Sequence, residues 1–255
     1  MAANNNLIMN FLQMLSKIKE REIKAVIFSF LFVVVLMSAY YILRPVRDAM
    51  ASDWTDAEVS WLWTLNFFIS TGIVALYGIA VSKFRFRLLV PTMYGIFAGS
   101  FVMFYLLGSI SDDRTLIDKA FYVWVSVFSL FNISVFWSFM SELYSKEQSG
   151  RLFGIIAVGA SVGGLIGPSL TAFFSVSLGT DNLMLIASTM LLIPIPIIFY
   201  LQSLKATDLN NGKLDLTPTN QAIGGNPIAG FKMLFSNPYL LPIALFIFLY
   251  TGISS

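Results

Sequence analysis

Six apolar runs, each about as long as a membrane-spanning helix, constrain this chain more than any other feature of its sequence. They cover residues 25–43, 61–81, 88–109, 120–141, 152–176 and 183–201. About 20 apolar residues cross the hydrocarbon core of a bilayer, where helices satisfy their own backbone hydrogen bonds. Only 12% of the 255 residues are charged, against about a quarter in soluble domains. The runs predict an all-α membrane protein in which residues 25–201 form a six-helix transmembrane bundle.

The basic residues predict how this bundle is oriented. Twelve of the 16 lysines and arginines lie before the first run or after the second, fourth and sixth, whereas only Arg44, Arg47, Arg114 and Lys119 occupy the alternate segments. Cytoplasmic loops carry the excess of basic residues. We therefore expect a multi-pass protein of the cytoplasmic (inner) membrane with a cytoplasmic N-terminus. Residues 1–24 form the segment before the first span, either as a helix on the membrane surface or as a disordered leader.

The sequence after the sixth run predicts a second set of spans. Residues 202–237 are rich in asparagine, glycine and proline, which is typical of a loop. Residues 238–255 are apolar again and begin a seventh span, which the chain does not complete. We expect this chain to be the N-terminal half of a twelve-helix carrier, whose partners are the lipid bilayer, a small-molecule solute and a missing C-terminal six-helix half.

Composition argues against several other functions. The chain has no cysteine and no histidine, which excludes disulfides, thiol catalysis, Ser-His-Asp triads and Cys/His metal sites. It has no glycine-rich phosphate loop of the usual kinds, and its net charge of +2 is not gathered in a basic stripe. We therefore expect no catalytic residue, no metal, no cofactor, no nucleic acid and no enzymatic activity.

The end of the first span holds the most informative polar residues. Arg44 and Arg47 are three residues apart, which puts them on one face of a helix, and Tyr40 and Asp48 lie within a turn of them. Arginine suits planar contact with phosphate or carboxylate, and ionisable groups at membrane depth often mark a ligand path. The alternative is that both arginines anchor the helix end among lipid headgroups.

Inside the later spans the notable polar residues are amides. Asn66 and Asn132 line a solute path or, alternatively, bond one helix to another. These spans contain no obvious acid for a proton relay. In the fifth span, Gly159, Gly163 and Gly167 repeat every four residues, and this stripe of small residues predicts close packing against another helix.

Two basic loops resemble those of major facilitator transporters. Between the second and third spans, Gly78, Lys83 and Arg87 stand at the offsets of that family's loop signature, although Ser82 replaces its acid and Phe86 one of its bases. Between the fourth and fifth spans, many members have an acid and an arginine about where Glu142 and Arg151 fall. The resemblance implies that these charged residues close the cytoplasmic side in one state and part in another.

The first span is similar to one branch of that superfamily, the ATP/ADP antiporters. Their first-span motif has Leu-Arg, two residues, a base and Asp, matched here by Leu43-Arg44 and Arg47-Asp48, and residues 136–139 and 151–154 are also similar. The family has lysine at position 47 and commonly aspartate at 45, where this chain has arginine and proline. The resemblance implies a carrier of an organic anion or a nucleotide working by alternating access, with Arg44 and Arg47 as phosphate contacts. The alternative is a carrier of a neutral or cationic solute with structural arginines.

Overall fold

A computed structural model of the chain describes residues 18–83, 86–209 and 235–246, without the side chains of residues 82, 83, 86 and 206. These residues are helical nearly throughout and include no strand. The elements are η1 (Glu20–Glu22), α2 (Ile23–Met50), η2 (Ala51–Asp53), α3 (Asp56–Lys83), α4 (Phe86–Ile110), α5 (Thr115–Leu143), α6 (Lys146–Leu178), α7 (Asn182–Leu192) and α8 (Pro194–Thr207). Six stretches of the described chain are long and apolar enough to cross a membrane. The predicted fold class is confirmed.

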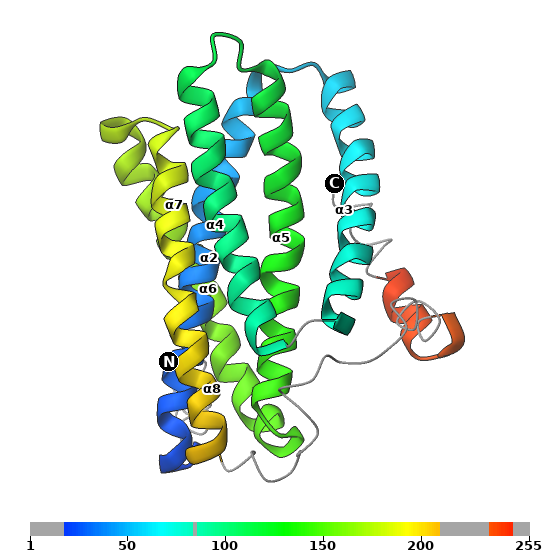
Figure 1. The fold of residues 1–255 in the computed structure, drawn as a ribbon, viewed down its shortest axis with the longest axis vertical. Coiled ribbons are helices and arrows are strands. Elements are labelled where there is room, and N and C mark those ends of the chain that lie inside the picture. Colours follow the sequence, from blue (N-terminus) through cyan, green and yellow to red (C-terminus); the bar gives the residue numbers. More distant parts are fainter. Residues whose placement is uncertain (1–17, 84–85, 210–234, 247–255) are drawn as a thin grey trace, which may run out of the picture. The chain divides into compact units, whose positions relative to one another are not determined.

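The chain divides into two compact units. The first comprises Met1–Phe68 and Val90–Thr217, and the second comprises Ile69–Leu89 and Pro218–Ser255. The first unit contains α2, α5, α6, α7, α8, the beginning of α3 and most of α4. The second contains the rest of α3, the first turn of α4 and a short helix at residues 240–246. Every contact discussed below lies within the first unit. Figure 1 labels α2, α5, α6, α7 and α8 of this unit.

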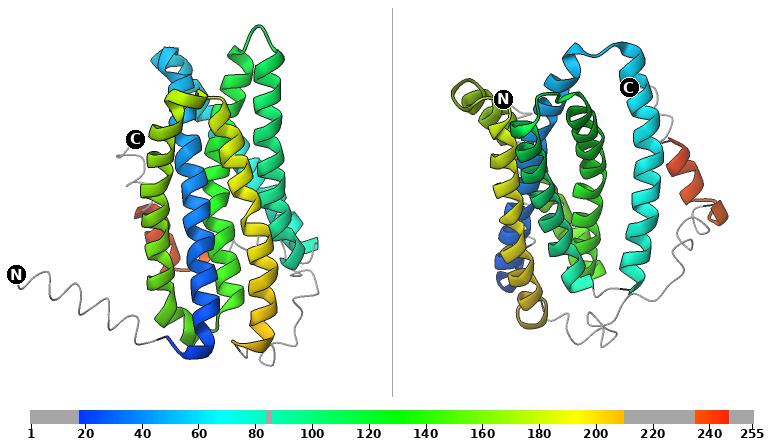
Figure 2. Two further views of the ribbon diagram at one scale, coloured as in Figure 1. Left: turned by 90° about the vertical axis from the view of Figure 1, so that its left-hand side faces the viewer. Right: turned by 45° about the horizontal axis from the view of Figure 1, so that its top comes forward.

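Helix α2 is the central element of the first unit. It packs against α5, α6, α7 and α8, and Figure 2 shows it between α6 and α7. Phe32, Leu36, Ile42 and Leu43 on α2 have no exposed surface. Because α2 is apolar on every side that meets a neighbour, its burial inside the unit follows from its composition.

The contact between α2 and α6 is unusually close because α6 presents a stripe of glycines to it. We call Gly159, Gly163 and Gly167 the glycine seam. A Cβ atom added at Gly163 would lie 2.5 Å from the carbonyl oxygen of Val34, and one at Gly167 would lie 2.7 Å from that of Ser38. No real side chain fits at such distances, so glycine allows the two backbones to touch. The predicted packing role of the stripe is confirmed.

The sixth span consists of two helices, α7 and α8, that meet at Ile193. The helical hydrogen-bond pattern is interrupted directly before Pro194, because proline has no N–H to donate and its ring crowds the preceding turn. Helix α8 then continues to Thr207, beyond the predicted end of the span. The predictions for residues 1–17, most of 202–237 and the end of the seventh span lie outside the described residues.

Candidate functional site

The last turn of α2 carries Arg47, whose guanidinium is partly buried and hydrogen-bonded to neighbouring side chains. Its Nε and Nη2 groups donate to Oδ1 of Asp48 at 2.9 and 2.7 Å, and its Nη1 group donates to Oγ of Ser126 at 3.3 Å. Only 17% of the side chain is exposed. A guanidinium has five N–H donors. Two of them have no partner among the residues that the structure describes, so this partly buried cation retains capacity for an anion.

Tyr122 of α5 fixes the plane of this guanidinium. The Cζ atom of Arg47 lies 5.1 Å from the centre of the Tyr122 ring, which is within range of a cation–π contact. The Tyr122 hydroxyl accepts a hydrogen bond of 2.8 Å from Nε1 of Trp63 on α3. Ser126, one turn further along α5, donates to the carbonyl oxygen of Tyr122 at 2.9 Å. Trp63, Tyr122 and Ser126 were not among the predicted site residues, because their relation to Arg47 depends on how α2 and α5 are aligned.

Arg44 lies beside the same carboxylate. Its Nε atom is 3.8 Å from Oδ2 of Asp48, and half of the side chain is exposed. We call Arg44, Arg47, Asp48, Tyr122 and Ser126 the Arg47 cluster. Two arginines share one aspartate, so the cluster carries one excess positive charge. Tyr40, which was predicted to belong to this site, packs its ring against Tyr41 and Phe128.

The two other basic residues of the alternate segments have carboxylates of their own. Arg114 donates to both oxygens of Asp181 at 2.8 and 3.0 Å, and this hydrogen bonding raises the pKa of Arg114 above its usual value. Lys119 donates to Oε1 of Glu58 at 2.8 Å. Among the four basic residues of these segments, Arg44 and Arg47 are therefore the two that share a single carboxylate.

The two predicted amides occupy different environments. Asn132 on α5 is only 1% exposed, and its Nδ2 donates a long hydrogen bond of 3.4 Å to the carbonyl oxygen of Leu36 on α2. Its Oδ1 atom has no partner among the described residues. Asn66 is half-buried on α3. In this conformation Asn132 joins two helices rather than lining an open path.

Replacing Asn132 with leucine, which has a similar shape, is expected to change the free energy of unfolding by less than about 1 kcal/mol. The long hydrogen bond to Leu36 is weak, and removing Asn132 also removes a buried oxygen that lacks a partner. The melting temperature of the purified protein in detergent tests this expectation. A large loss of stability would show that the hydrogen bond from Asn132 to Leu36 holds α5 on α2.

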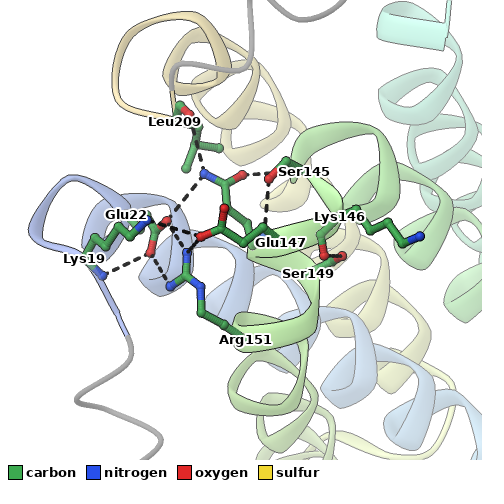
Figure 3. Close-up of polar contacts among 9 residues, drawn as sticks. Lys19, Glu22, Ser145, Lys146, Glu147, Ser149, Arg151 and Leu209 are labelled. Atoms are coloured by element: carbon green, nitrogen blue, oxygen red, sulfur yellow. Dashed lines mark hydrogen bonds and ion pairs between the residues drawn. The ribbon is translucent and has the colours of Figure 1, made fainter.

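The opposite end of α2 holds a second group of charged residues, shown in Figure 3. Glu22, at the start of α2, is 1% exposed and accepts hydrogen bonds of 3.2 and 2.9 Å from Nη1 and Nη2 of Arg151 on α6. Gln148 donates to Glu22 at 3.5 Å and to the carbonyl oxygen of Leu209 at 3.4 Å. The backbone N–H of Lys19 donates to Glu22 at 3.0 Å. We call these five residues the Glu22 cluster.

The pair of Glu142 and Arg151, which was predicted to form in one state and part in another, is not formed in this conformation. Glu142 instead accepts a hydrogen bond of 2.7 Å from Lys205 of α8. The chain turns between α5 and α6, so that Glu142 faces α8 while Arg151, in the second turn of α6, faces the start of α2. The side chain of Lys83 lies outside the described residues, and Arg87 is exposed in the second unit.

Comparison with protein families agrees with this architecture. The model of the Major Facilitator Superfamily matches residues 26–255, which include all six spans. The chain belongs to the major facilitator superfamily. No curated protein and no solved structure matches it in the corresponding searches. The chain is accordingly a multi-pass membrane protein of a family of secondary transporters, which bind small-molecule solutes within the membrane.

In a membrane protein of the major facilitator superfamily, the distance between the two clusters can be compared with the thickness of the bilayer. Glu22 and Arg47 are 25 residues apart along one continuous helix, a rise of about 38 Å at 1.5 Å per residue. The hydrocarbon core of a bilayer is about 30 Å thick. The two clusters therefore lie near opposite surfaces of the membrane, where a carrier that works by alternating access opens and closes.

Proposed function

We propose that this protein carries a small organic anion across the membrane by alternating access, with Arg44 and Arg47 binding its negative group. The supporting observation is the excess positive charge of the Arg47 cluster, in which two N–H groups of a partly buried guanidinium have no partner among the described residues. A carboxylate or phosphate oxygen forms short, strong hydrogen bonds with such donors. Asp48 and the ring of Tyr122 hold the guanidinium ready for that contact.

The first candidate substrate is a nucleotide, exchanged for another nucleotide. This choice rests on the resemblance of the first span to the ATP/ADP antiporters, and phosphate is the group best matched by two neighbouring arginines. Asn66 and Asn132 are further candidates for substrate contact in a conformation that opens the interior of the bundle. The later spans contain no obvious acid that could serve in a proton relay. This is consistent with exchange rather than proton-coupled transport.

We further propose that the N-terminus faces the cytoplasm across the inner membrane and that a second six-helix half completes the carrier. The Arg47 cluster would then lie at the outer surface and the Glu22 cluster at the cytoplasmic surface. Glu142, Arg151, Lys83 and Arg87 would be cytoplasmic and would contribute to gating there. The distribution of lysine and arginine supports this orientation.

Arg47→Ala tests the substrate site. Cells that express the full-length protein are expected to take up labelled ATP saturably and to release it when unlabelled nucleotide is added outside. Arg47→Ala is expected to reduce uptake at least about tenfold, which corresponds to about 1.4 kcal/mol of binding free energy. Arg47→Lys is expected to retain part of the uptake, because lysine keeps the charge but loses the planar fork.

Lys119→Met is the matched control, since it removes a cation from another of the alternate segments without touching Asp48. It is expected to keep most of the uptake, and quantifying each variant in the membrane separates transport from expression. Full uptake by Arg47→Ala would exclude the Arg47 cluster as the substrate site. Absence of ATP uptake by an inserted wild-type protein would exclude the nucleotide and require a panel of other anions and of neutral and cationic solutes.

A further inference from the structure

Glu22 is the only buried acidic residue in the part of the chain that the structure describes. Burying a carboxylate is costly unless several hydrogen bonds compensate for the lost water. Glu22 receives them from three places: the backbone of Lys19, the amide of Gln148 and the guanidinium of Arg151. Such an arrangement at the start of a transmembrane helix calls for a specific role.

The Glu22 cluster joins the ends of three helices. Glu22 is the N-cap residue of α2, Gln148 and Arg151 belong to the first two turns of α6, and Leu209 follows the end of α8 (Figure 3). Gln148 connects all three because its Nε2 group reaches both Glu22 and the carbonyl oxygen of Leu209. Its own position is fixed by Ser145, whose backbone N–H donates to Gln148 Oε1 at 2.9 Å.

Arg151 also has a second carboxylate within reach. Glu147, one turn earlier on the same helix, is 73% exposed and lies 3.7 Å from Nη2 of Arg151. If Arg151 leaves Glu22, it can pair with Glu147 and is not left without a partner. A buried ion pair contributes little net stability compared with its separated, hydrated partners. Pairing with Glu147 therefore lowers the cost of separating Arg151 from Glu22.

The glycine seam limits how far such a separation extends. Gly159, which touches α2 at Phe30 and Val33, is eight residues after Arg151, or about two turns. Beyond that point the two backbones are in direct contact. Only the ends of the helices are free to part, while the middle of the α2–α6 contact remains intact.

We propose that the Glu22 cluster is a releasable latch that holds the end of α8 against the starts of α2 and α6. Arg151 exchanges Glu22 for Glu147 when the latch opens, and Leu209 is then released from Gln148. Since Leu209 directly follows α8, the latch controls whether the end of α8 is fixed to the starts of α2 and α6. The proposal concerns the end of the unit opposite the Arg47 cluster and does not depend on which solute is carried.

Cysteine labelling tests the latch. This chain has no cysteine, so a Leu209→Cys variant of the full-length protein, compared with the same protein lacking it, reports the exposure of a residue that is 2% exposed in the latched state. We expect slow reaction with a maleimide in the otherwise unchanged protein. Adding Glu22→Gln, which keeps the size but removes the charge, is expected to accelerate labelling at least about tenfold, because the charge-assisted hydrogen bonds to Arg151 are lost.

Two controls make the outcome decisive. Leu183→Cys places the same change at a residue that is 1% exposed near the opposite surface, and its labelling should not respond to Glu22→Gln. Glu142→Gln breaks the separate pair with Lys205 of α8 and should not accelerate labelling at position 209. Unchanged labelling of Leu209→Cys, equal acceleration at position 183, or equal acceleration by Glu142→Gln would each overturn the proposal.

Discussion

Gly163→Ala is expected to destabilise the protein by about 1–3 kcal/mol, the usual cost of forcing extra volume into a well-packed contact. The added Cβ would lie 2.5 Å from the carbonyl oxygen of Val34 and 2.6 Å from the Cβ atom of Met37. Neither neighbour can move aside as the end of a flexible side chain could, because both belong to or adjoin the α2 backbone. The two helices would have to separate along the whole glycine seam.

Gly99→Ala on α4 is the matched control, since an added Cβ there meets nothing within 4 Å. Alanine is favoured over glycine inside a helix by about 0.5–1 kcal/mol, so this variant should be unchanged or more stable. Gly164→Ala should lie between the two, because its nearest neighbour is the ring of Tyr41 at 3.3 Å. Melting temperatures in detergent give the order, and equal values for Gly163→Ala and Gly99→Ala would contradict the role of the seam.

Arg151→Leu is expected to cost about 3 kcal/mol or more, as is typical when one partner of a buried ion pair is removed. Glu22 would remain buried at 1% exposure and keep only the N–H of Lys19 and the distant amide of Gln148 as donors. Loss of the two guanidinium contacts removes the cation that is hydrogen-bonded to this buried negative charge. The variant should therefore unfold at a clearly lower temperature or at a lower denaturant concentration.

Replacing the other partner of this ion pair should destabilise the protein less. Glu22→Gln leaves a neutral amide in the buried position, and Arg151 is already 22% exposed and 3.7 Å from Glu147. Glu142→Gln should cost only about 0–1 kcal/mol, because its pair with Lys205 is near the surface. A loss of stability for Arg151→Leu no greater than for Glu142→Gln would show that Glu22 is not held by Arg151. Combining Glu22→Gln with Arg151→Leu should recover part of the loss, since no charge then stays buried.

The glycine seam and the Glu22 cluster together describe how the first unit is held. Close backbone contact fixes α2 to α6 along their middle, while charged side chains fix their ends and the end of α8. A carrier whose halves rock around a central site needs each half to move largely as one body. A firm middle with a separable end meets that requirement and concentrates local change near one membrane surface.

The sequence by itself determined the spans, because a run of about 20 apolar residues has few alternatives to a transmembrane helix. It also determined the packing face of α6, since glycines spaced four apart necessarily share one side of a helix. Arg47 was recognised as a candidate from its position and chemistry. In each case the property belongs to one segment and needs no knowledge of its neighbours.

The tertiary structure alone decided which side chains meet. Arg151 pairs with Glu22, which is 129 residues away, rather than with the nearby Glu142. Arg47 lies over Tyr122 because α2 and α5 pack in a particular alignment. Helical periodicity shows which residues share a face, but a shift of one helix by a single turn of about 5.4 Å would give every charged group a different partner. That alignment is set by the packing of the whole unit. The helices could therefore be predicted from the sequence, whereas their contacts became known only from the structure.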